Sequence, residues 1–290
     1  MPRVLVIGDV IDDIIVVPHG PIRPDTDTIS NIRASPGGSA GNTAAWLGHL
    51  GVSTQFHGMV ADSDIARHSA EFERYGVVPR LQGHATLPTG AIVILVDGDS
   101  RSMLTERGAN DSIDLDSIAV DGFDAVHLTG YSLFTRQDAA PVTALIARAS
   151  AAGCAVSVDP GSAGFLLDYG VERFLTAIAG ATILVPNLEE GRVLTGLLDP
   201  AEVARALAAR GVTAAVTLDR AGAVVAADAG PAVAVPAVAA SMVDPTGAGD
   251  AFTAGFLAEF LATADAVAAA RAGTRLAAVA VSALGARPRV

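Results

Sequence analysis

Short apolar strands alternate with helical segments along most of this 290-residue chain, and this alternation constrains the fold more than any other feature. The strand candidates are rich in β-branched residues and flanked by Gly, Asp or Pro: Val4–Ile7, Ala125–Leu128, Ala155–Val158, Thr182–Val185 and Ala214–Leu218. The helix candidates are Asn42–Leu50, Ile65–Tyr75, Gln137–Ala151 and Pro200–Ala209, with two more after Gly249 that break near Thr263. This order predicts an α/β fold, a three-layer α/β/α sandwich with a mostly parallel central sheet covered on both faces.

Two regions interrupt the alternation, because strands follow each other there with no helix between them. Ile14–Val17 is expected to pair with Thr28–Ala34, and Ala91–Asp97 with Ser102–Thr105. These strands are more polar than the central ones, as expected of a small sheet with one face in water. We expect a small β-sheet lid, formed by segments of about 14–35 and 77–107, on a single domain of residues 1–290. Ordinary edge hairpins are the alternative.

The composition excludes several chemistries and partners. All 19 basic residues are arginine, so the chain contains none of the lysine that a Walker A loop, a protein kinase or a Schiff-base enzyme requires. The 31 acidic residues give a net charge of −12, which argues against binding to nucleic acid or to an anionic membrane. The single cysteine, Cys154, excludes an intrachain disulfide, and the first residues do not form a signal peptide. A cytoplasmic protein is expected.

The segment Asp244–Phe252, with the sequence DPTGAGDAF, is the most informative one in the chain. Gly247, Ala248 and Gly249 open a long helix, whose first backbone N–H groups lack partners within the helix and can bind an anion. Asp250 falls in the first turn, where a carboxylate can accept the proton of an attacking hydroxyl. An ordinary helix-capping acid is the simpler interpretation, but it does not account for three successive small residues.

This segment resembles the C-terminal signature of the ribokinase-like (PfkB) carbohydrate kinase family, at every defined position from Asp244 through Leu257. Gly37–Asn42, with the sequence GGSAGN, resembles the glycine-rich N-terminal signature of the same family. The resemblance implies transfer of the γ-phosphoryl group of ATP to a sugar hydroxyl. It implies a base and an anion hole at Asp250, Gly247, Ala248 and Gly249, and a sugar site at Asp13, Gly38 and Asn42.

The nucleotide side of the resemblance lies in three later segments. Asn187-Leu188-Glu189-Glu190 resembles the family motif that works near Mg²⁺ and the ATP phosphates, and it implies Glu190 as a metal ligand through water. Thr217 and Gly222 are implied as nucleotide contacts, together with Gly247 and Gly249. Ser282–Ala286 resembles the adenine-side loop, which implies a monovalent cation such as K⁺.

The end of the predicted lid supplies two further candidates. Gly108-Ala109-Asn110 resembles the stretch that returns to the main sheet near the substrate, which implies Asn110. The neighbouring Arg107 can grip a carboxylate or phosphate with two hydrogen bonds. Ala61, Arg67 and Asp219 depart from the family, because each stands where it has a glycine.

The sequence leaves the acceptor open among ribose-like sugars, acidic sugars such as 2-keto-3-deoxygluconate, phosphorylated hexoses and nucleosides. Two alternatives of another class remain. Gly37–Gly41 also fits the G-x-S-x-G elbow of a serine hydrolase with Ser39 as nucleophile, although no histidine follows His127. The other alternative is a non-catalytic sugar- or nucleotide-binding protein of the same fold. The unpaired strand edges of the lid favour a homodimer.

Overall fold

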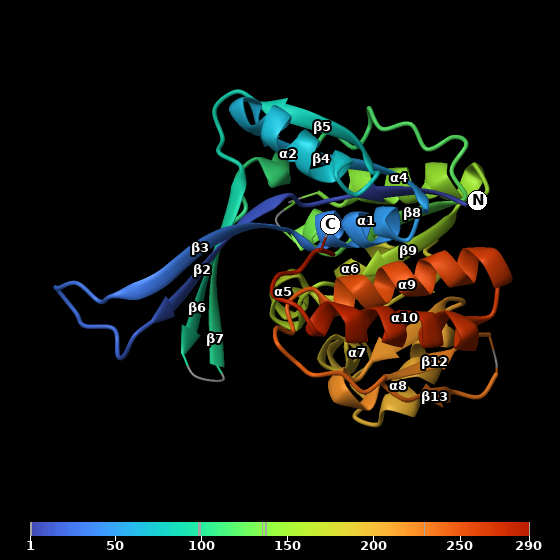
Figure 1. Cartoon of the computed structure of the whole chain (residues 1–290). Coiled ribbons are helices and arrows are strands. Elements are labelled where there is room, and N and C mark those ends of the chain that lie inside the picture. Colours follow the sequence, from blue (N-terminus) through green and yellow to red (C-terminus); the bar gives the residue numbers. More distant parts are fainter. Residues whose placement is uncertain (1, 98–99, 135, 137, 229, 290) are drawn as a thin grey trace.

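The computed structural model describes residues 2–97, 100–134, 136, 138–228 and 230–289, which form a nine-stranded and a four-stranded sheet (Figure 1). Pairing is parallel along the large sheet except at the last two strands of one edge. In spatial order, these strands are β13 (Val233–Val235), β12 (Ala223–Ala226), β11 (Thr213–Thr217), β10 (Ile183–Leu184), β9 (Ala155–Asp159), β8 (Ala125–Thr129), β1 (Arg3–Ile7), β4 (Ser53–Ala61) and β5 (Val78–His84).

All five strands predicted from apolar runs lie in this sheet, so the mostly parallel α/β architecture is confirmed. The strands β4, β5, β12 and β13 were not predicted. Strands β5 and β13 are the edge strands of the sheet, where a continuous apolar run is not needed, and β4 and β12 pair with them. Strand β4, for example, alternates polar and apolar residues along STQFHGMVA.

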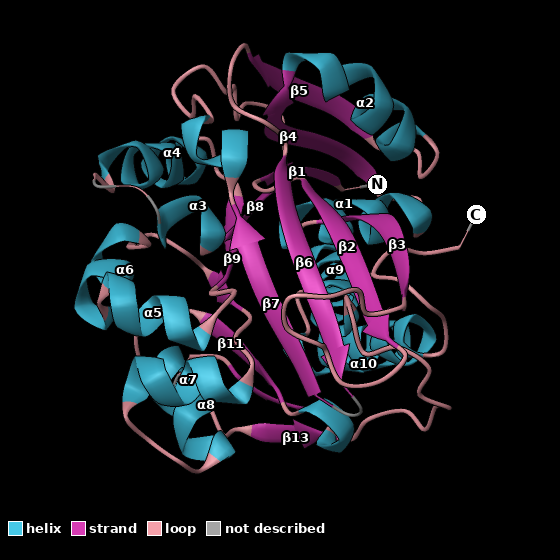
Figure 2. Ribbon diagram, turned by 90° about the vertical axis from the view of Figure 1, so that its left-hand side faces the viewer, coloured by secondary structure: helices cyan, strands magenta, loops and turns pink. Residues whose placement is uncertain are grey.

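Helices cover both faces of the large sheet (Figure 2). One layer contains α1 (Ser39–His49), α2 (Ile65–Glu73), α9 (Ala248–Thr263) and α10 (Ala266–Val281). The other contains α4 (Ala140–Ala151), α5 (Ala163–Tyr169), α6 (Val171–Ala177), α7 (Leu188–Thr195) and α8 (Pro200–Ala208). Val4 and Val6 of β1 pack in the first core, whereas Leu5 and Ile7 pack in the second.

The predicted helices are present with small shifts of their ends, and the break near Thr263 is confirmed. The predicted start of one helix, at Gln137, lies outside the described residues. Within the part of the chain that the structure describes, no helix has both the length and the apolar character needed to cross a membrane.

The four-stranded sheet projects from the main body (Figure 1). In spatial order its strands are β3 (Ser30–Gly37), β2 (Ile11–Pro18), β6 (Gly90–Asp97) and β7 (Ser100–Glu106). Antiparallel pairing of β2 with β3 and of β6 with β7 confirms both predicted hairpins. The boundary of the second segment differs, because β5 lies within the predicted range 77–107 but belongs to the large sheet.

The small sheet is less polar than the sequence led us to expect, because one of its faces carries exposed apolar side chains. Its Ile32 and Leu104 side chains are 67% and 59% exposed. Strand pairing places these side chains in two apolar rows, which we call the outer face: Ile32, Val16 and Leu95 in one, and Ala34, Ile14, Val93 and Leu104 in the other.

Candidate functional site

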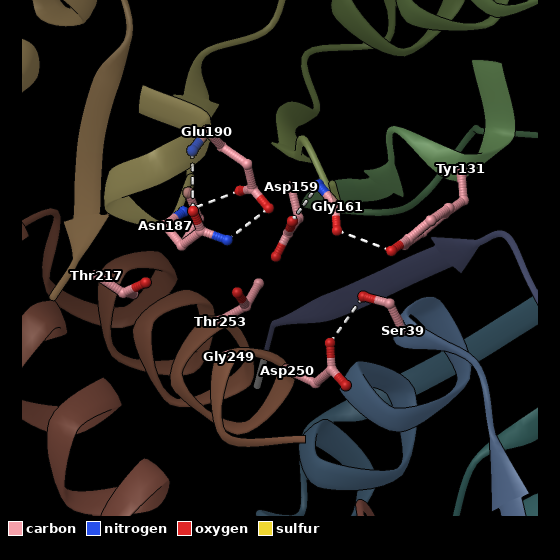
Figure 3. A pocket seen from close by; sticks show the side chains of 11 residues that line it. Ser39, Tyr131, Asp159, Gly161, Asn187, Glu190, Thr217, Gly249, Asp250 and Thr253 are labelled. Atoms are coloured by element: carbon pink, nitrogen blue, oxygen red, sulfur yellow. Dashed lines mark hydrogen bonds between the residues drawn. The ribbon is translucent and has the colours of Figure 1, made fainter. Parts of the chain in front are cut away.

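A pocket of about 220 Å³ lies at the carboxyl ends of the parallel strands (Figure 3). Successive strands contribute Tyr131 after β8, Asp159 at the end of β9, Asn187 after β10 and Thr217 at the end of β11. Helices α1 and α9 complete the wall with Ser39, Gly249, Asp250 and Thr253. This edge of an open α/β sheet is where ligands bind, because chain connections there leave a crevice.

Asp250 lies in the first turn of α9, as predicted, but its carboxylate does not cap that helix. Instead, Ser39 Oγ donates to Oδ1 at 2.7 Å, and Asn42 Nδ2 donates to Oδ2 at 2.9 Å. Burial raises the pKa of Asp250 to about 6, although these two hydrogen bonds lower it. The capping interpretation is therefore wrong, and two side chains of α1 instead orient this carboxylate at the pocket.

The glycines before Asp250 meet two different needs. Gly247 has φ 79°, and a Cβ there would lie 2.5 Å from the backbone oxygen of Ala286, so only glycine fits. A Cβ on Gly249 would meet nothing within 4 Å, because this residue borders the pocket. Protein packing thus explains Gly247, and room for a ligand explains Gly249.

The predicted anion hole needs one adjustment. The Ala248 N–H donates to the oxygen of Pro245 at 3.3 Å, so it does not point at a ligand. The first intrahelical bond of α9 comes from Ala251 to Gly247. Helix geometry therefore leaves the N–H groups of Gly249 and Asp250 for an anion.

The predicted adenine-side loop, Ser282–Ala286, lies beside this anion site. The Gly285 N–H donates to Asp244 Oδ2 at 3.1 Å, and Trp46 Nε1 donates to the oxygen of Ala286 at 2.9 Å. The first bond joins the loop to the DPTGAGD segment, and the second joins it to α1.

Asp13, the predicted sugar-site acid, lies on β2 of the small sheet. It is buried, and burial together with the charge of Asp9 raises its pKa to about 7. A Cβ at Gly37 would collide with its carboxylate, and a Cβ at Gly38 would lie 2.5 Å from the oxygen of Asp9. The glycine-rich segment therefore makes room for the β1–β2 connection and for Asp13.

Asn42 hydrogen-bonds to both Asp250 and Arg287. Besides its bond to Asp250, its Oδ1 accepts a hydrogen bond from Arg287 Nε at 3.2 Å. Sequence reasoning missed Arg287, which follows the adenine-side loop and carries no motif of its own. It also missed the buried Asp9, which accepts the N–H groups of Ser39 and Ala40 at the start of α1.

Two residues predicted to contact the substrate, Asn110 and Arg107, make bonds within the protein. The Asn110 amide accepts the Val10 N–H at 2.8 Å and donates to the Val10 oxygen at 2.9 Å. Arg107 stacks over Tyr131 at 5.1 Å, and its Nη1 lies 3.5 Å from Asp9. Both side chains thus hold the framework next to the pocket.

Asn187 and Glu190 form a capping box at the start of α7. Asn187 Oδ1 accepts the Glu190 N–H, and Glu190 Oε2 accepts the Asn187 N–H, each at 2.9 Å. Both residues also line the pocket, so the structural and the ligand-binding interpretations hold together.

Glu190 lies near Asp159 in the pocket (Figure 3). Burial raises the pKa of both carboxyls, and the charge of Glu190 further raises the pKa of Asp159. Carboxylate oxygens are the ligands that Mg²⁺ prefers, and a divalent cation would offset the repulsion between two buried acids. These residues fit a Mg²⁺ site. Asp159 was missed, although an acid between an apolar strand and Pro160 was the available signal.

The three departures from family glycines have separate explanations. Asp219 adopts φ 49°, so the backbone keeps the left-handed conformation that glycine favours and aspartate tolerates. Ala61 has φ −60°, which requires no glycine. Arg67 makes two hydrogen bonds of 2.8 Å to Asp12. The predicted nucleotide contact Gly222 has φ 102° and no room for a Cβ beside the Val235 oxygen.

The hydrolase interpretation of Ser39 is wrong. Its hydroxyl donates to a carboxylate rather than to a histidine, and the strand before it is an edge strand of the small sheet. A nucleophile elbow requires a strand of the central sheet.

Comparisons with known proteins identify the family of this chain. Residues 1–289 match the model of the pfkB family carbohydrate kinases. The ATP-dependent ribose-1-phosphate kinase of Halopiger xanaduensis is 35% identical over 277 residues, 91% of this chain and 87% of that protein. An uncharacterized sugar kinase of Archaeoglobus fulgidus is 31% identical over 246 residues, 83% and 96% of the two chains.

Solved structures lead to the same family. The crystal structure of adenosine kinase from Sinorhizobium meliloti superposes with a TM-score of 0.86 and 26% identity, covering 100% of this chain and 96% of that one. The chain therefore belongs to the pfkB family of carbohydrate kinases, and it is a phosphotransferase.

Proposed function

We propose that this protein transfers the γ-phosphoryl group of ATP to a hydroxyl of a small sugar or sugar acid, ribose-like or 2-keto-3-deoxygluconate-like. The observation that carries the proposal is Asp250, which Ser39 and Asn42 hold beside the first N–H groups of α9. A nucleoside is the second candidate acceptor, because the adenosine kinase of Sinorhizobium meliloti has a similar structure.

In this proposal, Asp13, Gly38 and Asn42 hold the acceptor. Asp250 accepts the proton of the attacking hydroxyl, whose oxygen bonds to the γ-phosphorus as the bond to the ADP oxygen breaks. The N–H groups of Gly249 and Asp250 stabilise negative charge on the phosphoryl oxygens.

The other end of the pocket holds the nucleotide. Asp159 and Glu190 would hold Mg²⁺, and Thr217 and Gly222 would lie toward ATP. Mg²⁺, when bound, neutralises charge on the phosphates. The small sheet, which carries Asp13, shields the acceptor from water and so limits hydrolysis of ATP.

The test is release of ADP from ATP and Mg²⁺ with a panel of ribose-like sugars, sugar acids, sugar phosphates and nucleosides, each assayed in K⁺ and in Na⁺. We expect one acceptor class to stimulate release well above the rate without acceptor. Binding of sugar and ATP with no ADP release from any acceptor would instead support the non-catalytic alternative. Equal rates in K⁺ and Na⁺ would contradict a monovalent-cation site at residues 282–286.

Gly249 lines the pocket and Gly247 packs against Ala286, so we expect different results from substituting these two glycines. We expect Gly249→Ala to fold normally and to weaken ATP binding roughly tenfold or more. Alanine keeps the backbone N–H, but its Cβ would occupy pocket space and move the phosphate away from that donor, and a lost hydrogen bond to a charged group is worth about 1.5–3 kcal/mol. Gly247→Ala should instead lower stability by about 1–2 kcal/mol from the left-handed backbone, with more from contact with Ala286. Thermal unfolding and the KM for ATP separate the two effects. An unchanged KM in Gly249→Ala would contradict a phosphate site there.

The raised pKa values predict the acid side of the pH profile. Asp250 must be ionised to accept a proton, and its pKa is about 6, whereas that of Asp13 is about 7. We expect kcat/KM to fall as the pH drops through 7 to 6, with a slope steeper than one proton. Stability should change in the opposite sense. Each acid has a higher pKa in the folded state than in the unfolded state, so its protonated form favours folding. This contribution is complete below the unfolded-state pKa and is lost as the pH rises through 6 to 7. A profile that is flat down to pH 5 would contradict both roles.

We also propose that the apolar outer face of the small sheet packs against a second copy of this chain. Apolar surface exposed at this level is expected to be buried in an interface. Light scattering should then give a dimer, and Leu104→Glu should give a folded monomer. Leu198→Glu is the control, since Leu198 is 74% exposed on the main body. A monomeric wild-type protein would contradict the interface.

A further inference from the structure

Arg287 is a buried arginine directly behind the acceptor side of the site. Its residue is 7% exposed, and its guanidinium lies over the Phe72 ring at 4.8 Å. A Cβ at Gly41 would lie 2.8 Å from its Nη2, so α1 passes against it closely. A buried positive charge is costly unless nearby groups compensate it, so its partners indicate its purpose.

Within the described part of the chain, the hydrogen bonds of Arg287 go to the glycine-rich segment. Nη2 donates to the Gly37 oxygen at 3.0 Å, and Nε donates to Asn42 Oδ1 at 3.2 Å. Asn42 in turn donates from Nδ2 to Asp250 at 2.9 Å. A guanidinium only donates and a carboxylate only accepts, so the amide between them has a single orientation.

No carboxylate hydrogen-bonds to Arg287 among the described contacts, although Asp13 and Asp250 lie near enough for its charge to act on them. That charge lowers the pKa of each, against the burial that raises it. Its Nη1 is buried and makes no hydrogen bond with any described residue. The arginine thus acts on both acids through space and on Asp250 through Asn42.

We propose that Arg287 is a positioning residue for phosphoryl transfer, which fixes the Asn42 amide against Asp250 and supplies the buried positive charge behind Asp250 and Asp13. This inference rests on the proposed role of Asp250 as base. A residue near the C-terminus thus takes part in the chemistry of a site that is otherwise built mainly from residues at the ends of the strands.

Three variants separate the two effects. Arg287→Met removes both the charge and the hydrogen bonds. Arg287→Lys keeps the charge, but a single ammonium cannot reproduce the two-sided geometry of the guanidinium. Arg289→Met is the matched control, because Arg289 is exposed two residues further along the chain.

The first measurement does not require a known acceptor. In protein labelled with ¹³C at the aspartate carboxyls, the signal missing from Asp250→Asn identifies Asp250, and its shift is followed with pH. We expect Arg287→Met to raise the pKa of Asp250 by roughly one unit or more, the size expected of a nearby charge at an effective dielectric near 20. Arg287→Lys and Arg289→Met should leave it near that of the wild type. An unchanged pKa in Arg287→Met would overturn the electrostatic role.

The second measurement is kcat with the acceptor that supports ADP release. We expect both Arg287→Met and Arg287→Lys to lose roughly 10–100-fold in kcat, the usual scale for a residue that orients a reacting group, with less than a threefold change in the KM for ATP. Full activity of Arg287→Lys would overturn the orienting role. If no acceptor supports ADP release, the proposed function fails, whereas the titration still decides the role of the charge. If Arg287→Met does not fold, Arg287→Gln replaces it with the same expectation.

Discussion

Asp250→Asn is expected to lower kcat by roughly 10²–10⁴-fold, the usual contribution of a positioned general base. Asparagine has nearly the same shape as aspartate, so Ser39 and Asn42 keep a polar side chain beside them. The asparagine amide cannot accept the proton of the attacking hydroxyl. ATP binding should persist, because Asp250 contributes only its backbone N–H to the phosphate. Steady-state kinetics and ATP titration provide the measurement.

The stability of the same variant supplies an internal control. The pKa of Asp250 in the folded protein is about 6, so ionising it at pH 8 opposes folding. Asp250→Asn should therefore unfold at a temperature no lower than the wild type, and lost activity cannot come from unfolding. Glu259→Gln, an acid on the same helix outside this pocket, should retain full activity. Near-normal turnover by Asp250→Asn would remove Asp250 from the mechanism.

The double variant Asp159→Asn with Glu190→Gln is expected to raise the Mg²⁺ concentration for half-maximal activity by roughly 10–100-fold or more, the scale seen when groups that hold a metal are changed. Both substitutions remove a buried negative charge and keep an oxygen at the site. Glutamine also serves in a capping box, so α7 should still begin at Leu188. The measurement is activity across a Mg²⁺ titration.

A stability readout accompanies this prediction. Burial raises the pKa of both acids, and the charge of Glu190 further raises that of Asp159, so the double variant should be more stable than the wild type without metal. Glu189→Gln is the matched control, because this neighbouring acid is exposed and pairs with Arg192 at 2.6 Å. It should alter neither the Mg²⁺ response nor the unfolding temperature. A double variant with an unchanged Mg²⁺ response would exclude these residues as the metal site.

The features that could be predicted from the sequence are those that depend on residues close together in the chain. The apolar β-branched runs predicted β1, β8, β9, β10 and β11, because a strand buried on both faces must be apolar throughout. The Asn187–Glu190 spacing describes a helix start, and it is indeed a capping box. The small residues before Asp250 similarly predicted the start of α9.

The partners of those residues could not be predicted in the same way. Asp250 lies 211 residues from Ser39 and 208 from Asn42, and Asn42 lies 245 residues from Arg287. No local pattern records which helix start faces which strand end. Asn110 shows that a motif also does not reveal the partner of a side chain. Its amide hydrogen-bonds to the backbone of Val10, a contact that the sequence did not predict.

The sequence by itself determined the α/β layering, the two hairpins and the helix start that can bind an anion, because hydrophobic periodicity and unsatisfied N–H groups are local properties of the chain. Only the tertiary structure decided that Asp250 binds α1 instead of capping α9, and that Asp159 joins Glu190. It also decided that an arginine near the C-terminus lies behind Asn42. The reason is that parallel strands bring their carboxyl ends to one edge of the sheet, where residues from distant segments share a single buried site.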